Sequence, residues 1–489
     1  MSKPVDKQDF LAGLTCRTQG WYVHHAPDEI PGPGLKWRFW IGDDVHERAR
    51  RWLGAGTMLP RTPQDAAIAA AQDAVAKRNN TMFFEATFAW NGCVVRADAI
   101  RSHGTEWDLI EIKSGKSPDD GEKVKAEYVD DVAYTCMVAR GAGLKVSRSF
   151  LVLINRDYRL NGTAEMFTYV DVTELVNARA AEMAAVADDV ATKAAAAERP
   201  APEMIFECKN CDFFATECVG RDIPDPLFII PRINAKKFEA LKQYERISRV
   251  PPDADLTPIQ RGVVDVIQSG QPKVDLDELN ILDTLQWPVR YLDFEAVTPH
   301  LPWFEDVAPY ETLPFQYSLH VIDAPGAEVR HSEYLAPIAD DWRRDMTETL
   351  LRDLGDAGSI VVYSGYEKGR LRALGERFPD LADKLNAAIE RLFDLEVVFK
   401  KGYQHPGFGG RTSIKKVLPV MAPEPELSYK QLAVNNGDDA TGVFGLMRVG
   451  VTDAEFVDAQ RERLLEYCKL DTYAMVRLHS ATEALRRDG

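Results

Sequence analysis

The sequence contains no apolar run close to the roughly 20 residues needed to cross a bilayer, so we expect no membrane-spanning segment. The first residues, MSKPVDKQDFLAG, lack the apolar core of a secretion signal, so we expect a cytoplasmic protein without a membrane partner. Cysteines are few, seven in 489 residues, and the reducing cytoplasm disfavours a disulfide framework. Cysteines that lie close together are therefore interpreted first as metal ligands.

An excess of basic residues is also lacking, because 59 Lys and Arg stand against 76 Asp and Glu, a net charge of −17. The field of the whole molecule would repel a polyanion, so any contact with nucleic acid must be made by local basic grooves. The chain does have 45% hydrophobic and 28% charged residues, a globular balance that excludes a mainly disordered chain or a fibre. Its length predicts two or three domains.

Strand-like and helix-like patterns alternate along the chain, which predicts an α/β protein. In the N-terminal part, the patterns predict strands at 82–90, 93–100, 107–115 and 149–158, and helices at 42–54 and 125–141. An Ala-rich stretch from about Val172 to Ala197 predicts one long helix, which Pro200 and Pro202 end.

The second half begins a new α/β unit after a less distinctive stretch of polar helix patterns. Strands are predicted there at 290–297, 315–323, 329–337 and 358–365, and a helical end at about 454–485. We therefore divide the chain into a first domain, 1–222, a helical connector, 223–288, and a second domain, 289–489.

Acidic residues interrupt two neighbouring strands of the first domain. Asp98 lies in an otherwise apolar strand, and Glu111 and Lys113 leave the same face of the next one. If these strands pair, Asp98 lies beside Glu111, and two adjacent carboxylates bind a hard divalent cation. Lys113 would orient an attacking water or offset phosphate charge, and His46 would add a nitrogen ligand. A surface hairpin with alternating polar residues is the alternative.

The order of His46, Asp98 and the Glu111-x-Lys113 pair resembles the PD-(D/E)xK nucleases of the RecB/AddB type. The resemblance implies a restriction-endonuclease-like domain in which Mg2+ or Mn2+ is bound by His46, Asp98 and Glu111. It also implies that Asp98, Glu111 and Lys113 are catalytic. The following helix departs from the family pattern, since it offers Asp131 but no glutamine.

A C-x2-C-x6-C cluster follows the long helix, with thiols at Cys208, Cys211 and Cys218. A CxxC turn can aim two thiolates at one centre, and soft ligands favour zinc or an iron–sulfur cluster. Cys16 is the candidate for a fourth ligand. This arrangement resembles the iron–sulfur nucleases of the AddB and CRISPR-associated type, which implies a structural [4Fe-4S] cluster on the four cysteines. Zn2+ on the same thiolates is the alternative, and a reduced thiol cluster without metal is a third interpretation.

The second domain carries another set of acids. Asp293 and Glu295 share one face of an apolar strand, and burying two like charges is costly unless cations neutralise them. Glu367 follows the carboxyl end of a predicted strand, where α/β sites gather. Tyr467 and Asp471 are four residues apart on a predicted helix and share a face.

These motifs, DxE, YSGYE and YxxxD, resemble those of the DnaQ-like, RNase H-fold 3′–5′ exonucleases of the DEDDy class. The resemblance implies an RNase H-like domain whose two Mg2+ or Mn2+ ions are bound by Asp293, Glu295, Glu367 and Asp471. Tyr467 would position the attacking water. Two positions depart from the family, since Glu367 stands in place of an Asp and Ser364 in place of an Asn. Asp394 is the alternative third ligand.

The C-terminal half also resembles an uncharacterised bacterial domain found behind RecB-like nucleases, in the stretches 314–320, 410–419, 427–432 and 467–472. The loop 399–416 contains five Lys or Arg, no acid, and the aromatic residues Tyr403 and Phe408. Basic and aromatic residues together suit a single nucleic-acid strand. A Gly-rich surface loop is the alternative.

Taken together, the motifs predict a two-headed, metal-dependent nuclease that acts on DNA, especially on single-stranded ends. DNA repair or defence against foreign DNA would suit such an enzyme by family analogy. One alternative is a nucleic-acid-binding scaffold in which one or both heads are inactive. Another is an exonuclease that degrades RNA.

Overall fold

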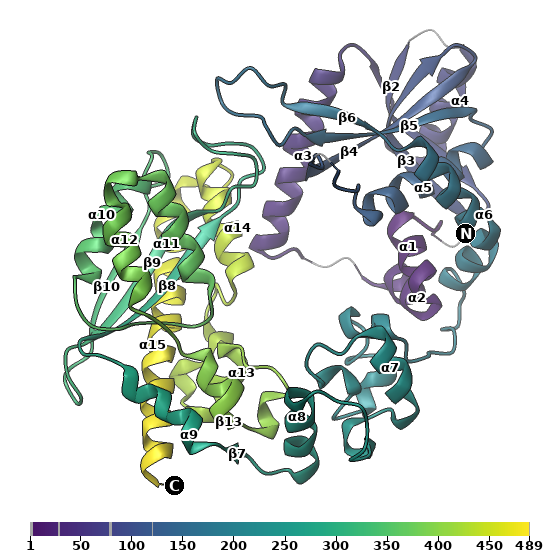
Figure 1. The fold of residues 1–489 in the computed structure, drawn as a ribbon. Helices are drawn as coiled ribbons and strands as arrows, with labels where there is room; N and C mark the ends of the chain where they lie inside the picture. Colours follow the sequence, from purple (N-terminus) through teal and green to yellow (C-terminus); the bar gives the residue numbers. More distant parts are fainter. Residues whose placement is uncertain (1–2, 28–29, 78–80, 120, 489) are drawn as a thin grey trace. The chain divides into compact units, whose positions relative to one another are not determined.

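The computed structural model describes residues 3–27, 30–77, 81–119 and 121–488 (Figure 1). It shows a mixed α/β protein with several sheets. The chain divides into two units, and unit 1 comprises Met1–Ile30, Arg38–Arg221 and Pro299–Glu311. Unit 2 comprises Pro31–Trp37, Asp222–Thr298 and Thr312–Gly489, so the predicted connector 223–288 falls within unit 2. Among the described residues, no helix has the length and apolar character needed to span a membrane.

Unit 1 is built on a six-stranded sheet in the order β1-β2-β3-β4-β5-β6. Its strands are β1 (Thr57–Met58), β2 (Met82–Trp90), β3 (Cys93–His103), β4 (Glu106–Lys116), β5 (Val146–Ile154) and β6 (Phe167–Asp171). β2, β3 and β4 are antiparallel neighbours, whereas β4 and β5 are parallel. The four strands predicted from the sequence are confirmed, and β1 and β6 are additional.

The helices of unit 1 are α1 (Lys7–Thr15), α2 (Arg17–His25), most of α3 (Pro33–Leu53), α4 (Gln64–Lys77), α5 (Ala126–Gly141) and α6 (Thr173–Ala194). α5 connects the parallel pair β4 and β5, and all residues from 132 to 139 are buried because α5 lies between the sheet and other helices. α6 packs against α5, and α1 and α2 pack against α6. These contacts hold α1 beside the sheet.

Unit 2 contains a five-stranded sheet in the order β10-β9-β8-β11-β12. Its strands are β8 (Val289–Val297), β9 (Leu313–Ile322), β10 (Arg330–Leu335), β11 (Ile360–Val362) and β12 (Leu392–Asp394). β8, β9 and β10 are antiparallel to their neighbours, and β8, β11 and β12 are parallel. All ten residues of β9 are buried, as expected for a strand whose sheet is covered on both faces.

The helices of unit 2 are α7 (Ala235–Leu241), α8 (Pro258–Ser269), α9 (Leu276–Leu279), α10 (Arg343–Leu354), α11 (Tyr366–Arg377), α12 (Ala382–Glu390), α13 (Ile414–Met421), α14 (Gly437–Arg448) and α15 (Val457–Asp488). α15 packs along β8 and β9, and α14 packs on β8 (Figure 1). The ring of Phe444 in α14 stacks on Phe315 with centroids 4.0 Å apart. The predicted C-terminal helix is confirmed. Its packing brings the YxxxD motif of Tyr467 and Asp471 to the central strand β8.

A small two-stranded sheet joins the predicted connector to the segment after β12. β13 (Tyr403–Gln404) is antiparallel to β7 (Lys273–Val274), and the Asp275 amide donates to the carbonyl of Gly402 at 2.8 Å. The segment predicted as a loop, 399–416, is thus mostly ordered. It contains a turn of π-helix, η8 (Val398–Gly402), the strand β13, a 3-10 turn, η9 (Pro406–Phe408), and the start of α13.

Candidate functional site

The first group of acids, the N-terminal acidic cluster, consists of Asp98, Glu111 and Asp131. β3 and β4 pair antiparallel, which confirms the predicted pairing and places Asp98 beside Glu111. The Asp98 carboxylate accepts a hydrogen bond from the Ile112 amide at 2.8 Å. Asp131 comes from α5, which packs across β3 and β4. Three carboxylates from three elements therefore meet at the middle of the sheet.

Two lysines accompany this cluster. The Lys113 ammonium lies 2.6 Å from an oxygen of Asp131 and 3.9 Å from Glu111. The Lys7 ammonium lies 2.6 Å from Asp131 and 3.2 Å from Glu111. Burial alone would lower the pKa of Lys7, but the charges of Glu111 and Asp131 outweigh it and raise the pKa, so Lys7 stays charged. The sequence analysis missed Lys7, because it is 104 residues from Glu111 and no local pattern marks it.

His46, the predicted nitrogen ligand, also lies at this cluster. Its Nδ1 atom is 3.7 Å from an oxygen of Asp98. Burial, and then the nearby charge of Lys113, lower the pKa of His46. The imidazole is therefore neutral near pH 7 and keeps a lone pair for a cation.

The electrostatics of the N-terminal acidic cluster suit a divalent cation. Burial, and then the charge of Asp98, raise the pKa of Glu111 to about 8. The Oε1 atom of Glu111 is buried and has no hydrogen-bond partner in the structure. Leaving a buried carboxylate oxygen unsatisfied is costly, and a cation bound by oxygen would remove that cost.

The second group, the C-terminal acidic cluster, consists of Asp293, Glu295, Glu367 and Asp471. Ligand oxygens of Asp293, Glu295 and Asp471 all lie within 4.8 Å of one another. β8 supplies the first two and α15 the third, and the packing of α15 on β8 brings them together. The structure thus unites residues that are separated by more than 170 positions in the sequence.

Glu367 completes the cluster from α11. It lies in the first turn of that helix, just beyond β11, and is 2% exposed. Burial raises its pKa to about 7, against a hydrogen bond with Asp293 that lowers it. Its Oε2 atom is buried and has no hydrogen-bond partner among the described residues. Like Glu111, this side chain offers an unsatisfied oxygen to a cation.

Burial dominates the charge state of the remaining acids in this cluster. Burial, and then the charge of Asp471, raise the pKa of Glu295 to about 8 and also raise the pKa of Asp293. Burial raises the pKa of Asp471 to about 6. Lys415 is the cation that opposes these shifts at Glu295 and Asp471. One ammonium cannot balance four carboxylates, so the donor set fits divalent cations.

Two tyrosines and Lys415 surround Asp471. Tyr467, one helical turn before it, hydrogen-bonds to it, and the Lys415 ammonium donates to the Tyr467 hydroxyl at 3.3 Å. The Tyr429 hydroxyl donates to Asp471 Oδ1 at 2.5 Å. Tyr467 was predicted from its spacing, but the contacts of Tyr429 and Lys415 at this cluster were not. Both lie far from Asp471 in the sequence, Tyr429 in a stretch marked only by a family resemblance and Lys415 in the basic loop 399–416.

Asp394, the alternative ligand, has a different environment. One of its oxygens accepts hydrogen bonds from the amides of Ser364 and Glu396, each at 2.9 Å. Ser364 has φ +100°, a strained conformation for a residue with a side chain. Asp394 therefore holds the turn that leads into α11 and Glu367.

The four predicted cysteines, Cys16, Cys208, Cys211 and Cys218, line one small pocket in unit 1. They form no disulfide. Burial raises the pKa of Cys208 to about 11, and the other three thiols contribute to that rise. Among the described residues, the acidic triad Asp293, Glu295 and Asp471 is the group found with three ligand residues close enough to hold a metal ion, and the four thiols are not such a group. Cys16 directly follows α1, the helix that carries Lys7.

Comparison with known proteins gives one match to a family model. A model described as "Domain of unknown function (DUF2779)" matches residues 290–413. The matched stretch includes Asp293, Glu295 and Glu367 and ends before Tyr467 and Asp471. None of the curated proteins compared with the chain matches it.

The raised pKa of Glu295 predicts the pH dependence of the metal-free protein. The pKa of Glu295 is about 8 in the folded protein and about 4.3 in the unfolded chain, so the folded protein binds this proton more tightly. The stability that results is fully present below about pH 4 and is lost as the pH rises through 8. In EDTA, we expect the melting temperature to fall between pH 5.5 and pH 8.5. Glu295→Gln cannot ionise and should melt roughly 5 °C above wild type at pH 8.5. Differential scanning calorimetry measures this.

The control is Glu390→Gln, a change at an exposed carboxyl. It should leave the melting temperature within about 1 °C of wild type at both pH values. At pH 8.5, added Mn2+ should stabilise wild type more than Glu295→Gln. A Glu295→Gln variant that melts below wild type in EDTA at pH 8.5 would show that this carboxylate is not strained by burial.

Proposed function

We propose that the protein is a metal-dependent nuclease with two active sites that hydrolyses phosphodiester bonds of DNA. The observation that carries this proposal is the C-terminal acidic cluster, where Asp293, Glu295 and Asp471 converge within 4.8 Å with little positive charge to balance them. Such a cluster is costly to bury, and cations repay that cost. The DxE, YSGYE and YxxxD motifs on these residues support the assignment to phosphodiester hydrolysis.

The C-terminal cluster supports a 3′–5′ exonuclease site. Bound Mg2+ or Mn2+ would supply a polarised phosphate and an activated water there. Asp293, Glu295, Glu367 and Asp471 would hold the cations. The Tyr467 hydroxyl, kept in place by Lys415, would orient the attacking water. Tyr429 fixes Asp471 through a short hydrogen bond, so the carboxylate is already positioned before substrate arrives.

The N-terminal acidic cluster supports a second hydrolytic site of the PD-(D/E)xK type. Asp98 and Glu111 would hold Mg2+ or Mn2+ with the neutral imidazole of His46. Lys113 places an ammonium beside the carboxylates, where it offsets phosphate charge. Lys7 places a second ammonium at the same spot, from an element that the family pattern does not include.

The arrangement of strands supports a specific architecture for each unit. In unit 2, the DxE pair lies on β8 at the centre of a mixed sheet, which we assign to an RNase H-like domain. In unit 1, Asp98 and Glu111 lie on paired central strands with α5 across them, which we assign to a restriction-endonuclease-like domain. A role in DNA repair or in defence against foreign DNA rests on analogy with the families that the motifs resemble.

The four cysteines would hold a [4Fe-4S] cluster. The four cysteines line one pocket, and the resemblance to the iron–sulfur nucleases supports this cluster over zinc on the same thiolates. The centre would stabilise the fold by joining α1 and α2 to the segment after α6.

A nuclease assay tests the two sites separately. End-labelled single- and double-stranded DNA and RNA are incubated with Mn2+ and wild type, Glu111→Gln, Asp293→Asn or the double variant. Losing one cation ligand should remove about 2.7 kcal/mol of transition-state stabilisation, which is roughly a 100-fold loss of the activity of that site. The double variant should retain about 1% of the wild-type activity. Glu182→Gln and Asp323→Asn, which change exposed acids, should behave like wild type.

Three outcomes would change the assignment. If wild type binds DNA but degrades no substrate with Mg2+ or Mn2+, the protein is a nucleic-acid-binding scaffold. If only Asp293→Asn abolishes activity, the N-terminal site is not a nuclease under these conditions. If RNA is degraded and DNA is not, the substrate is RNA.

Anaerobic purification tests the cysteine cluster. A [4Fe-4S] centre predicts a brown protein with iron and sulfide in equal amounts, and Cys208→Ser should bleach it. Cys136→Ser, a change at a buried cysteine outside the pocket, should keep the colour. A colourless protein with one equivalent of zinc would contradict the iron–sulfur assignment and leave the acidic clusters unaffected.

A further inference from the structure

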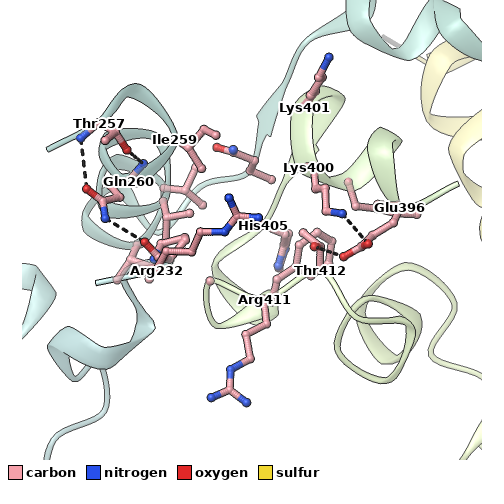
Figure 2. A pocket seen from close by; sticks show the side chains of 18 of the residues that line it. Arg232, Thr257, Ile259, Gln260, Glu396, Lys400, Lys401, His405, Arg411 and Thr412 are labelled. Carbon is pink, nitrogen blue, oxygen red and sulfur yellow. Dashed lines mark hydrogen bonds and ion pairs between the residues drawn. The ribbon is translucent and has the colours of Figure 1, made fainter. Parts of the chain in front are cut away.

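A large pocket lies in unit 2, apart from the C-terminal acidic cluster. Its volume is about 1070 Å³, at or above the upper end of the roughly 300–1,000 Å³ found for small-molecule sites. Figure 2 shows its two walls, with Arg232, Thr257, Ile259 and Gln260 on one side and Lys400, Lys401, His405 and Arg411 on the other. We call it the α8 pocket. Neither Asp293, Glu295, Glu367 nor Asp471 lines it.

Both walls of the α8 pocket are held in place by backbone contacts. Gly410 has φ +69°, and a Cβ atom there would lie 2.1 Å from the carbonyl oxygen of Ile229. The two segments therefore touch through their main chains, which only glycine permits. The pairing of β7 with β13 fixes the same segments further along. The pocket is part of the folded unit.

The lining is strongly basic although the protein carries a net charge of −17. Five Lys or Arg line the pocket, and they are Arg232, Lys237, Lys400, Lys401 and Arg411. Only two acids do, Glu278 and Glu396. Glu396 is already bound by Lys400 at 2.5 Å and by the Thr412 hydroxyl at 2.7 Å. The remaining positive charge makes this a local site for a polyanion.

Three of these cations are available to a ligand. In the part of the chain that the structure describes, the side chains of Arg232, Lys401 and Arg411 make no hydrogen bond or ion pair. Arg232 also has φ +51°, a conformation that costs energy for a residue with a side chain. Gln260 stabilises it by donating to the preceding carbonyl, that of Pro231, at 2.8 Å. Strain held in this way is typical of ligand sites, and arginine is well suited to phosphate.

Between the cations, the pocket offers surfaces for bases. Val263 and Val266 of α8 face the segment that carries Phe408. The partly exposed ring of His405 lies 5.8 Å from the Phe408 ring and extends this apolar surface. The buried Oε1 atom of Gln404 has no hydrogen-bond partner in the structure. A base can stack on the accessible His405 ring, against which the buried Phe408 packs, and a free amide can bind the edge of a base.

The α8 pocket is connected to the C-terminal acidic cluster by a short stretch of chain. Thr412 lines the pocket, and its carbonyl accepts a hydrogen bond from Tyr363 at 2.6 Å. Three residues later, the Lys415 ammonium contacts the Tyr467 hydroxyl in the cluster. The backbone of these three residues spans at most about 10 Å, and the Lys415 side chain covers the remaining distance to Tyr467, so the pocket is adjacent to the cluster.

We propose that the α8 pocket binds single-stranded DNA a few nucleotides from the 3′ end that enters the C-terminal acidic cluster. This inference rests on the proposed exonuclease. The cations contact phosphates, and the apolar walls contact unpaired bases, which a duplex keeps stacked inside itself. The pocket would thus give the enzyme its preference for single strands.

Binding measured without hydrolysis tests the pocket independently of the activity. Fluorescein-labelled dT10 is titrated in EDTA and followed by anisotropy at several KCl concentrations. The triple variant Arg232→Gln, Lys401→Gln, Arg411→Gln should bind at least 10-fold more weakly and lower the salt slope by about 2, since each single-strand phosphate contact contributes about 0.7. The control triple, Arg330→Gln, Arg372→Gln, Lys384→Gln, changes exposed residues outside the pocket and should bind within twofold of wild type.

Cross-linking of wild type gives a second readout that does not depend on the folding of a variant. A 4-thiothymidine placed three nucleotides from the 3′ end should cross-link to peptides from 259–267 or 399–412. A dT10 oligonucleotide that does not bind wild type, or that binds both triples equally, overturns the proposal. The proposal is also overturned if a decaglutamate peptide binds wild type as dT10 does, and the variant Arg232→Gln, Lys401→Gln, Arg411→Gln weakens the binding of both by the same factor. Tight, pocket-dependent binding without any hydrolysis would uphold the pocket and refute the exonuclease.

Discussion

The structure depends on one electrostatic conflict, in which carboxylates are buried side by side with too little positive charge to balance them. In the C-terminal cluster, Lys415 is the cation that opposes the pKa shifts of Glu295 and Asp471. The same chain shows how a buried acid is otherwise handled. Glu85 is 2% exposed, but three arginines bind its carboxylate at 2.8–3.2 Å. Among the described residues, the unsatisfied oxygens of Glu111 and Glu367 lack such partners, which is why we propose divalent cations at both clusters.

The fold positions these acids through its central elements. β8 lies between β9 and β11, and α15 packs on it, so Asp471 meets the DxE pair without help from loops. In unit 1, α1 brings Lys7 to Glu111 and ends at Thr15, directly before Cys16, which lines the cysteine pocket. The cysteines are therefore joined to the N-terminal acidic cluster by a single nine-residue helix. We propose that a metal on these cysteines stabilises the helix that places Lys7, so removing it would loosen that helix.

The sequence predicted what local spacing encodes. Asp98 and Glu111 lie on two strands joined by a short turn, so the alternation of side chains along the strands places them together. Tyr467 and Asp471 are four residues apart on a helix, so one helical turn places them on the same face. The contacts of Lys7, Lys415 and Tyr429 with these acids were not predicted, because they depend on how distant helices pack and no short pattern records that. The α8 pocket is a similar case. The basic loop 399–416 was noted, but the wall that Arg232 and α8 provide comes from the predicted connector, and no local pattern records that the two segments meet.

The most direct test of cation binding at the acidic clusters is anomalous diffraction from crystals of the full chain soaked in Mn2+. We expect Mn2+ peaks bounded by Asp293, Glu295 and Asp471, and a separate peak beside Asp98 and Glu111. The first set should vanish in Asp293→Asn while the second remains. Wild-type crystals in millimolar Mn2+ with no anomalous peak at either cluster would contradict the assignment of these carboxylates as metal ligands.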